Sequence, residues 1–399
     1  MNIFNIAEKA VPFALPFLLV FSRTTADFTV ILIVILFLMK SFLNNDWQWL
    51  KEPWLKLIYF FFFYLIFINA FFSENVVDSL IYSVSFLRWP LFCVAIYYWI
   101  FKSQISIKKV FYSICVLLLF LTLHLWIQYF TNQSISRLSV PFSDNVIPGR
   151  FVLFYSVLAL GILSFSKEVS FGSKNLLKIF TILFIAYGTI FITGERMVLL
   201  LITFSIFSIL FGLFIDSKKN FIPILIFLTS LLLFIIIFYY YFPEVFFRSI
   251  TSSQRKVFNL LNSDYGSVFL TAYHKWLNNP FVGGGFHQYR FIDPQIAPGL
   301  KNVGSTLHAH NYPLGLLVET GIIGFLIFYT TIIKITLINL KNLNNKSFYL
   351  NIVLLNLIFI YFFPISTHFS LSHNWINASA WLLLAFTFVL KNNEKKYTL

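Results

Sequence analysis

The sequence contains few charged residues: Asp, Glu, Lys and Arg make up only 11% of its 399 residues, whereas 59% are hydrophobic. Because soluble globular domains carry about 25% charged residues, this composition excludes a soluble globular protein. The apolar residues gather in runs of about 17–25, each long enough to cross the ~30 Å hydrocarbon core of a bilayer. We therefore predict an all-α, polytopic integral membrane protein.

Cysteine is also scarce. Cys93 and Cys115 both fall inside apolar runs, so we expect packed thiols and no disulfide framework.

No small-residue cleavage site follows residues 1–10, which favours a retained first helix over a cleaved signal peptide. Internal repeats and low-complexity linkers are not evident, and residues 1–399 are predicted to form a single membrane domain.

The apolar runs predict about twelve transmembrane helices. Pro12 and Pro16 are expected to shorten the first, since proline disrupts a helix interior. The predicted spans lie near residues 11–22, 27–42, 56–72, 79–101, 109–129, 150–166, 176–193, 197–215, 221–242, 312–334, 348–364 and 374–391.

Lysine is concentrated in alternate connections between these spans. The short outward loops, such as residues 73–78, are nearly free of it, so the positive-inside rule places both termini in the cytoplasm. The net charge of +14 therefore mostly reports topology and requires no nucleic-acid partner. The inward lysines are Lys9, Lys40, Lys51, Lys56, Lys102, Lys108, Lys109, Lys167, Lys174, Lys178, Lys218, Lys219, Lys334, Lys341, Lys346, Lys391, Lys395 and Lys396.

Arginine and histidine show the opposite distribution. All eight arginines and all seven histidines fall in outward loops, at outward helix ends or inside the membrane. Arginine suits phosphate binding and histidine suits proton transfer near neutral pH. The distribution predicts an outward-facing site that handles an anion. The alternative is that external loops are simply where ordered polar structure exists.

Residues 243–311 form the longest polar interval and are predicted to be one large external loop. A loop of this length is expected to contain short helices of its own. Residues 267–278 are the best candidate, because Asn279-Pro280 would end such a helix. Gly283-Gly284-Gly285 then predicts a flexible turn, and no Lys-Ser/Thr follows that would make it a phosphate-binding P-loop.

Ionisable residues mark the junction between this loop and the next apolar run. His308, His310 and Asn311 precede the run, and Glu319 lies within it. Such groups are costly at a membrane helix, which favours a functional role. The alternative for a lone histidine here is an ordinary interfacial side chain. A neutral imidazole can accept a proton, because its unperturbed pKa is about 6.5.

Two motifs resemble the O-antigen ligase family, part of a membrane glycosyltransferase superfamily. His310-Asn311, followed after nine residues by Gly321 and after two more by Gly324, is similar to the family signature. Thr193-Gly-Glu-Arg196 resembles the Thr/Ser-x-Ser-Arg stretch of the superfamily core, except that a glutamate replaces the small residue. The resemblance covers about residues 180–330.

The resemblance implies transfer of a glycan from an undecaprenyl-diphosphate carrier to a sugar hydroxyl of lipid A–core. The reaction would take place on the periplasmic face of a bacterial inner membrane. His310 would activate the acceptor hydroxyl, with His308 as its neighbour, and Asn311 would position the substrate or the ring. Glu319 would orient a histidine or complete a buried network. Gly321 and Gly324 are expected to permit close helix packing.

Arginines are the candidates for holding the departing diphosphate. Arg196 would do so, unless it pairs locally with Glu195 or anchors a helix end. Arg88 and Arg150 could join the same pocket or form structural ion pairs. Family members carry an arginine before the Asn-Pro and glycines of the loop, where Ser267 aligns here, so the role stays open among the loop arginines. These are Arg248, Arg255 and Arg290.

The outward carboxylates are scattered, and no Asp-x-Asp motif is present. Metal-dependent glycosyltransferases usually cluster carboxylates around a divalent ion, whereas arginines can neutralise the same leaving group. We therefore expect a metal-independent, inverting transfer with no cofactor. Zinc binding by His308 and His310 would need further ligands such as His368 and His373.

Other functions remain open. An O-antigen polymerase would use a second lipid-linked glycan as acceptor, and a protein O-oligosaccharyltransferase would use a protein. From a different class, a transporter or flippase would also have about twelve spans, and it should contain discontinuous helices or an inverted repeat. The large one-sided loop argues against transport.

Overall fold

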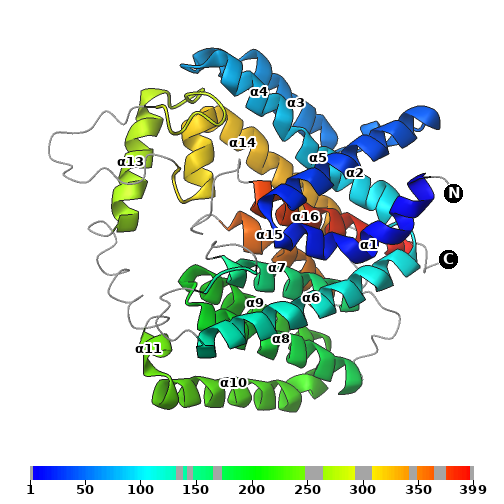
Figure 1. The fold of residues 1–399 in the computed structure, drawn as a ribbon, viewed down its shortest axis with the longest axis vertical. Helices are drawn as coiled ribbons and strands as arrows, with labels where there is room; N and C mark the ends of the chain where they lie inside the picture. Colours follow the sequence, from blue (N-terminus) through cyan, green and yellow to red (C-terminus); the bar gives the residue numbers. More distant parts are fainter. Residues whose placement is uncertain are drawn as a thin grey trace.

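The computed structural model describes residues 3–131, 138–141, 147–164, 173–247, 264–292, 308–340, 348–363 and 374–395. Throughout these ranges the regular elements are helices, and no strand is present (Figure 1). The elements are α1 (Ile3–Phe21), α2 (Arg23–Leu43), η1 (Gln48–Lys51), α3 (Leu55–Phe67), η2 (Asn69–Phe72), α4 (Val76–Phe86), α5 (Arg88–Ala95), η3 (Ile96–Ile100), α6 (Gln104–Thr131), α7 (Pro148–Ser164), α8 (Ser173–Thr193), α9 (Arg196–Asp216), η4 (Lys218–Asn220), α10 (Phe221–Tyr241), α11 (Pro243–Phe246), α13 (Asp264–Asn278), α14 (Tyr312–Leu340), α15 (Phe348–Phe362) and α16 (Asn374–Lys395).

Length and composition identify membrane-spanning candidates among these helices. Within the described ranges, nine are long and apolar enough to cross a bilayer, which confirms the all-α polytopic membrane fold. Three shorter apolar helices, Pro148–Ser164, Phe348–Phe362 and Trp375–Leu390, coincide with the remaining predicted spans. The total of twelve spans therefore stays a prediction.

Helix α7 lies at the centre of the bundle. It packs against α6, α8, α9, α15 and α16, and its side chains from Pro148 to Leu163 are buried.

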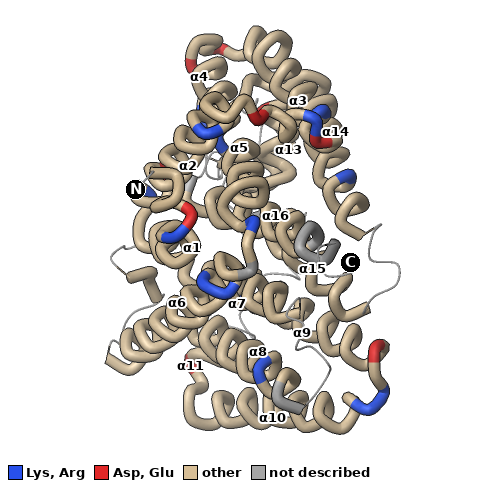
Figure 2. The backbone as a smooth tube through the Cα atoms, turned by 90° about the vertical axis from the view of Figure 1, so that its right-hand side faces the viewer, with Lys and Arg blue, Asp and Glu red and all other residues tan. Residues whose placement is uncertain are grey.

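The peripheral α10, in contrast, exposes large apolar side chains such as Phe221, Ile222 and Ile226. Most residues along the described chain are uncharged (Figure 2). An apolar exterior of this kind suits contact with lipid.

Helix α1 differs from the sequence prediction. It begins at Ile3 and continues through Pro12 and Pro16, both of which are buried. Neighbouring helices can supply hydrogen bonds that accommodate proline in a membrane helix. Here α1 packs against α2 and α6, and the hydroxyl of Ser113 on α6 donates to the carbonyl of Phe13. The prolines therefore do not shorten the first helix as predicted.

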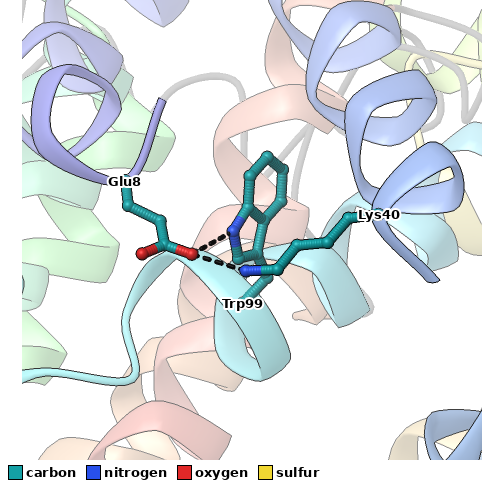
Figure 3. Close-up of polar contacts among 3 residues, drawn as sticks. All are labelled: Glu8, Lys40 and Trp99. Atoms are coloured by element: carbon teal, nitrogen blue, oxygen red, sulfur yellow. Dashed lines mark hydrogen bonds and ion pairs between the residues drawn. The ribbon is translucent and has the colours of Figure 1, made fainter. Parts of the chain in front are cut away.

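A polar cluster joins α1 to two other segments (Figure 3). The Glu8 carboxylate accepts hydrogen bonds from Lys40 Nζ at 2.5 Å and from Trp99 Nε1 at 2.6 Å. Lys40 lies in the last turn of α2, and its Nζ is 5.1 Å from the centre of the Trp99 ring in η3. This pairing explains how the chain accommodates a carboxylate within a mostly apolar first helix.

Candidate functional site

The run that begins at Tyr312 is a broken helix. Gly321 has φ 62° and ψ −174°, so α14 divides into a short segment before this residue and a long one after it. A Cβ atom at Gly321 would lie 2.2 Å from the carbonyl oxygen of Phe281. Only glycine combines this left-handed backbone with so close an approach.

The break is filled by the segment 279–285 of the external loop. The N–H groups of Gly284 and Gly285 donate to the carbonyls of Val318 and Glu319, at 3.0 and 3.1 Å. Beyond the break, the N–H groups of Ile322 and Ile323 donate to residues 280 and 281, at 2.9 and 3.2 Å. Backbone groups freed by the break therefore find partners, as a non-helical segment at membrane depth requires.

These contacts correct two predictions about the glycines. Gly283 and Gly285 have φ values of 81° and 101°, and a Cβ at Gly283 would lie 2.4 Å from the backbone nitrogen of Gly321. The triple glycine is thus a close backbone contact with α14, not a flexible turn. Close helix packing is confirmed for Gly324, where a Cβ would lie 2.8 Å from the Tyr64 ring. Gly321 instead permits the break.

Two polar side chains from the third predicted span hold the same junction. The Tyr64 hydroxyl on α3 lies 2.9 Å from the Val282 carbonyl and 2.7 Å from that of Thr320. Asn69 Nδ2 donates to the carbonyls of Val282 and Glu319, both at 2.8 Å. Sequence reasoning missed both residues, and their only signal was polarity within an aromatic-rich run.

Glu319 faces the external loop from the short segment of α14. Its side chain is buried, with 3% exposure, and its carboxyl group accepts hydrogen bonds from the backbone N–H groups of His287 and Tyr289. The predicted buried network is therefore present around this residue. The partners named here are backbone groups of the loop rather than an imidazole.

His308 and His310 lie together at the start of α14. Their ring centroids are 3.9 Å apart, and His310 has a left-handed backbone with φ 48°. Asn311 is buried and caps the helix, because its Oδ1 accepts a hydrogen bond from the Leu314 N–H at 2.9 Å. The cap fixes where the helix starts and so where the two histidines stand.

Both imidazoles are held in their neutral form. Burial lowers the pKa of His310, and the positive charge of Arg150 lowers it further. Burial lowers the pKa of His308 to about 4, with His310 contributing to the same shift. A neutral imidazole retains a lone pair that can accept a proton at pH 7.

Arg150 reaches this site from the first turn of α7. Its side chain is buried, with 7% exposure. The preceding Gly149 N–H donates to Glu195 Oε1 at 2.6 Å, and the Glu195 N–H contacts Thr193 Oγ1 at 3.3 Å. The turn that ends in Arg196 therefore lies against the helix end that carries Arg150. Glu195, which departs from the family motif, holds the two together.

The remaining predicted arginines either make other contacts or lie outside the described ranges. Arg88 Nε lies 3.1 Å from Asp27 Oδ1 on α2, which supplies the partner that an intramembrane charge needs. Arg290 is exposed, with its guanidinium 4.6 Å from the centre of the Phe291 ring. Arg248 and Arg255 lie outside the described residues, as do His368 and His373.

A further histidine, His287, was not predicted as part of the site. Its ring stacks on Tyr82 with centroids 3.6 Å apart, and burial followed by the charge of Arg290 lowers its pKa to about 4. Among the described residues, no group of three or more His, Cys, Asp or Glu side chains could hold a metal ion. Metal independence remains a prediction.

Comparison with known families agrees with the motifs. Residues 180–329 match the family model described as O-Antigen ligase. The matched region contains Arg196, both histidines of the site and the broken part of α14, whereas Arg150 precedes it. No curated protein matches the chain.

Proposed function

We propose that this chain, which carries an O-antigen ligase family domain over residues 180–329, transfers a glycan from undecaprenyl diphosphate to a sugar hydroxyl of lipid A–core. The observation that carries the proposal is the proximity of a neutral His310 to the buried Arg150. A base within electrostatic range of a cation suits a reaction that deprotonates a hydroxyl while an anion departs.

In the proposed reaction His310 accepts the proton of the acceptor hydroxyl. The hydroxyl oxygen then attacks the anomeric carbon of the donor sugar and forms the new glycosidic bond. The bond from that carbon to the phosphate oxygen breaks, and its electron pair leaves with the diphosphate. Direct attack inverts the anomeric configuration. His308 lies beside the base, with the two ring centroids 3.9 Å apart.

Arg150 and Arg196 are proposed to hold the diphosphate. Each presents a planar guanidinium that can donate two parallel hydrogen bonds to phosphate oxygens. Arg196 begins α9 and Arg150 lies in the first turn of α7, and the Glu195–Gly149 hydrogen bond joins these two helix ends. Helix N-termini also favour negative charge. On this proposal the arginines neutralise the leaving group, and activity persists in excess EDTA.

The proposed site faces the periplasm from a bacterial inner membrane, with both chain termini in the cytoplasm. The basis is the lysine distribution along the sequence. Membrane lipids surround the apolar exterior. The lipid chain of the donor is embedded in the bilayer, and the donor reaches the site from there.

A transporter is the second candidate, because discontinuous helices are typical of that class. The break in α14 is the feature that favours it. In transporters the free ends of such helices bind the substrate. Here segment 279–285 of the same chain occupies the break, and its backbone bonds to both ends. This arrangement favours a break that anchors the external loop over one that binds a transported substrate.

A deletion strain separates the glycosyltransferase alternatives. Loss of a ligase should leave full-length, carrier-linked glycan that is not attached to lipid A–core. Carrier-linked glycan stopped at one repeat would indicate an O-antigen polymerase instead. Normal lipopolysaccharide together with loss of protein glycosylation would indicate a protein O-oligosaccharyltransferase.

A further inference from the structure

Tyr289 is held on both sides of its backbone by buried ionisable side chains. Its N–H donates to the carboxyl group of Glu319, and its carbonyl accepts a hydrogen bond from Lys275 Nζ at 2.7 Å. Glu319 and Lys275 are only 3% and 2% exposed. They come from α14 and α13, two helices that pack against each other (Figure 1).

Burying such groups costs free energy unless hydrogen bonds compensate. Lys275 also lies over the Tyr289 ring, with Nζ 4.3 Å from the ring centroid. The Glu319 carboxyl group takes a second N–H, that of His287, whose φ of 64° turns the backbone. The N–H groups of His287 and Tyr289, on either side of Gln288, therefore both point to the Glu319 carboxyl group.

The side chain of Tyr289 connects this arrangement to the histidine pair. It packs in a small apolar cluster with Ala272, Ile292, Ala309 and Val318. Ala309 is the residue between His308 and His310, and it is 2% exposed. Ala309 therefore belongs to the same apolar cluster as Tyr289, whose own backbone is fixed by two buried side chains.

We propose that Glu319 and Lys275 are positioning residues that hold the Tyr289 backbone and thereby fix the His308–Ala309–His310 segment. Neither residue contacts substrate on this view. The inference rests on the proposed function only in regarding that segment as the site of proton transfer. The local order that it predicts around Ala309 can be measured without any glycan transfer.

Thiol accessibility tests that local order directly. Ala309→Cys, introduced into a Cys93→Ala, Cys115→Ala background, should react slowly with a polar maleimide. Glu319→Gln or Lys275→Met should each raise its labelling rate about tenfold, the factor equivalent to ~1.4 kcal/mol. The matched controls Glu244→Gln and Lys178→Met alter exposed residues and should leave the rate unchanged.

Two additional cysteines distinguish local opening from general unfolding. Ala378→Cys, at a buried position on α16, should stay protected in both variants, and Leu277→Cys, at an exposed position, should react rapidly in all of them. The proposal is wrong if the cysteine at 309 stays protected in both variants. It is equally wrong if the cysteine at 378 becomes reactive, because the pair would then support the whole bundle.

Kinetics distinguish positioning from direct catalysis. Because both residues act through Tyr289, each single variant should lower kcat by roughly 10–100-fold, and the double variant should be no worse than the poorer single one. The acid limb of the pH–rate profile should persist in each. Loss of that limb in Glu319→Gln alone would show that Glu319 itself transfers the proton. If the two variants label faster although even the wild type ligates nothing, the positioning role of Glu319 and Lys275 stands and the proposed reaction is refuted.

Discussion

At the scale of single residues, the environment of His310 sets the pH dependence of the proposed reaction. Burial and Arg150 both lower the pKa of this imidazole below its usual 6.5. The base is thus available down to a lower pH, and activity is lost only as pH falls through the lowered pKa. We expect the acid limb of kcat/KM to have its midpoint below pH 6.5. A midpoint at or above 6.5 would contradict this assignment.

The guanidinium of Arg196 supports a second prediction at this scale. Arg196→Lys keeps the positive charge but removes the planar fork that binds phosphate through two hydrogen bonds. We expect transfer to fall roughly tenfold or more, with weaker donor affinity if the diphosphate is bound before the reaction. Arg23→Lys, at an exposed position on α2, is the matched control and should be silent. Equal rates for the two variants would remove Arg196 from the site.

At the scale of elements, the break in α14 depends on Gly321. Gly321→Ala places a side chain on a left-handed backbone, which costs about 1–3 kcal/mol, and directs its Cβ at the Phe281 carbonyl. We expect a lower thermal unfolding temperature in detergent and loss of activity. Gly315→Ala, earlier on the same helix, meets only the Cβ of Ala309 at 3.9 Å and should be neutral or slightly stabilising. A stable, active Gly321→Ala protein would show that the break is dispensable.

The sequence predicted the helices well and the break poorly. Hydropathy and length located the apolar runs, and Asn279-Pro280 located the end of α13. The apolar pattern continues across Gly321, however, and the groups that bond to the break lie about 40 residues earlier in the loop or, for Tyr64 and Asn69, in α3 and η2. Contacts between segments so distant in the chain leave no periodic signal.

The candidate site shows the same division. The His308–His310 pair was predictable because both histidines lie within a few residues of a helix start. The proximity of Arg150 to His310 was not, since it depends on how α7 packs within the bundle. Pairing of Arg88 with Asp27 and the hydrogen bond from Gly149 to Glu195 are likewise tertiary contacts that the sequence left open.

At the scale of the whole molecule, the lysine distribution predicts the orientation in the membrane. Reporter fusions after Lys219 should lie in the cytoplasm, and fusions within residues 249–304 should lie in the periplasm. Alkaline phosphatase and green fluorescent protein fusions measure the two outcomes independently. The reverse pattern would place His310 on the cytoplasmic side and would refute the periplasmic site.

The central claim is that this chain joins a carrier-linked glycan to lipid A–core and that His310 is the base. The most direct measurement is transfer by purified protein in liposomes that contain undecaprenyl-diphosphate-linked glycan and lipid A–core. The wild type should form glycan-bearing lipid A–core, and His310→Ala should lower the rate about 10²–10⁴-fold while still binding donor. The control His274→Ala, on α13, should retain activity. Polymerised carrier-linked glycan as the only product, or a His310→Ala protein that ligates at the wild-type rate, would contradict the claim.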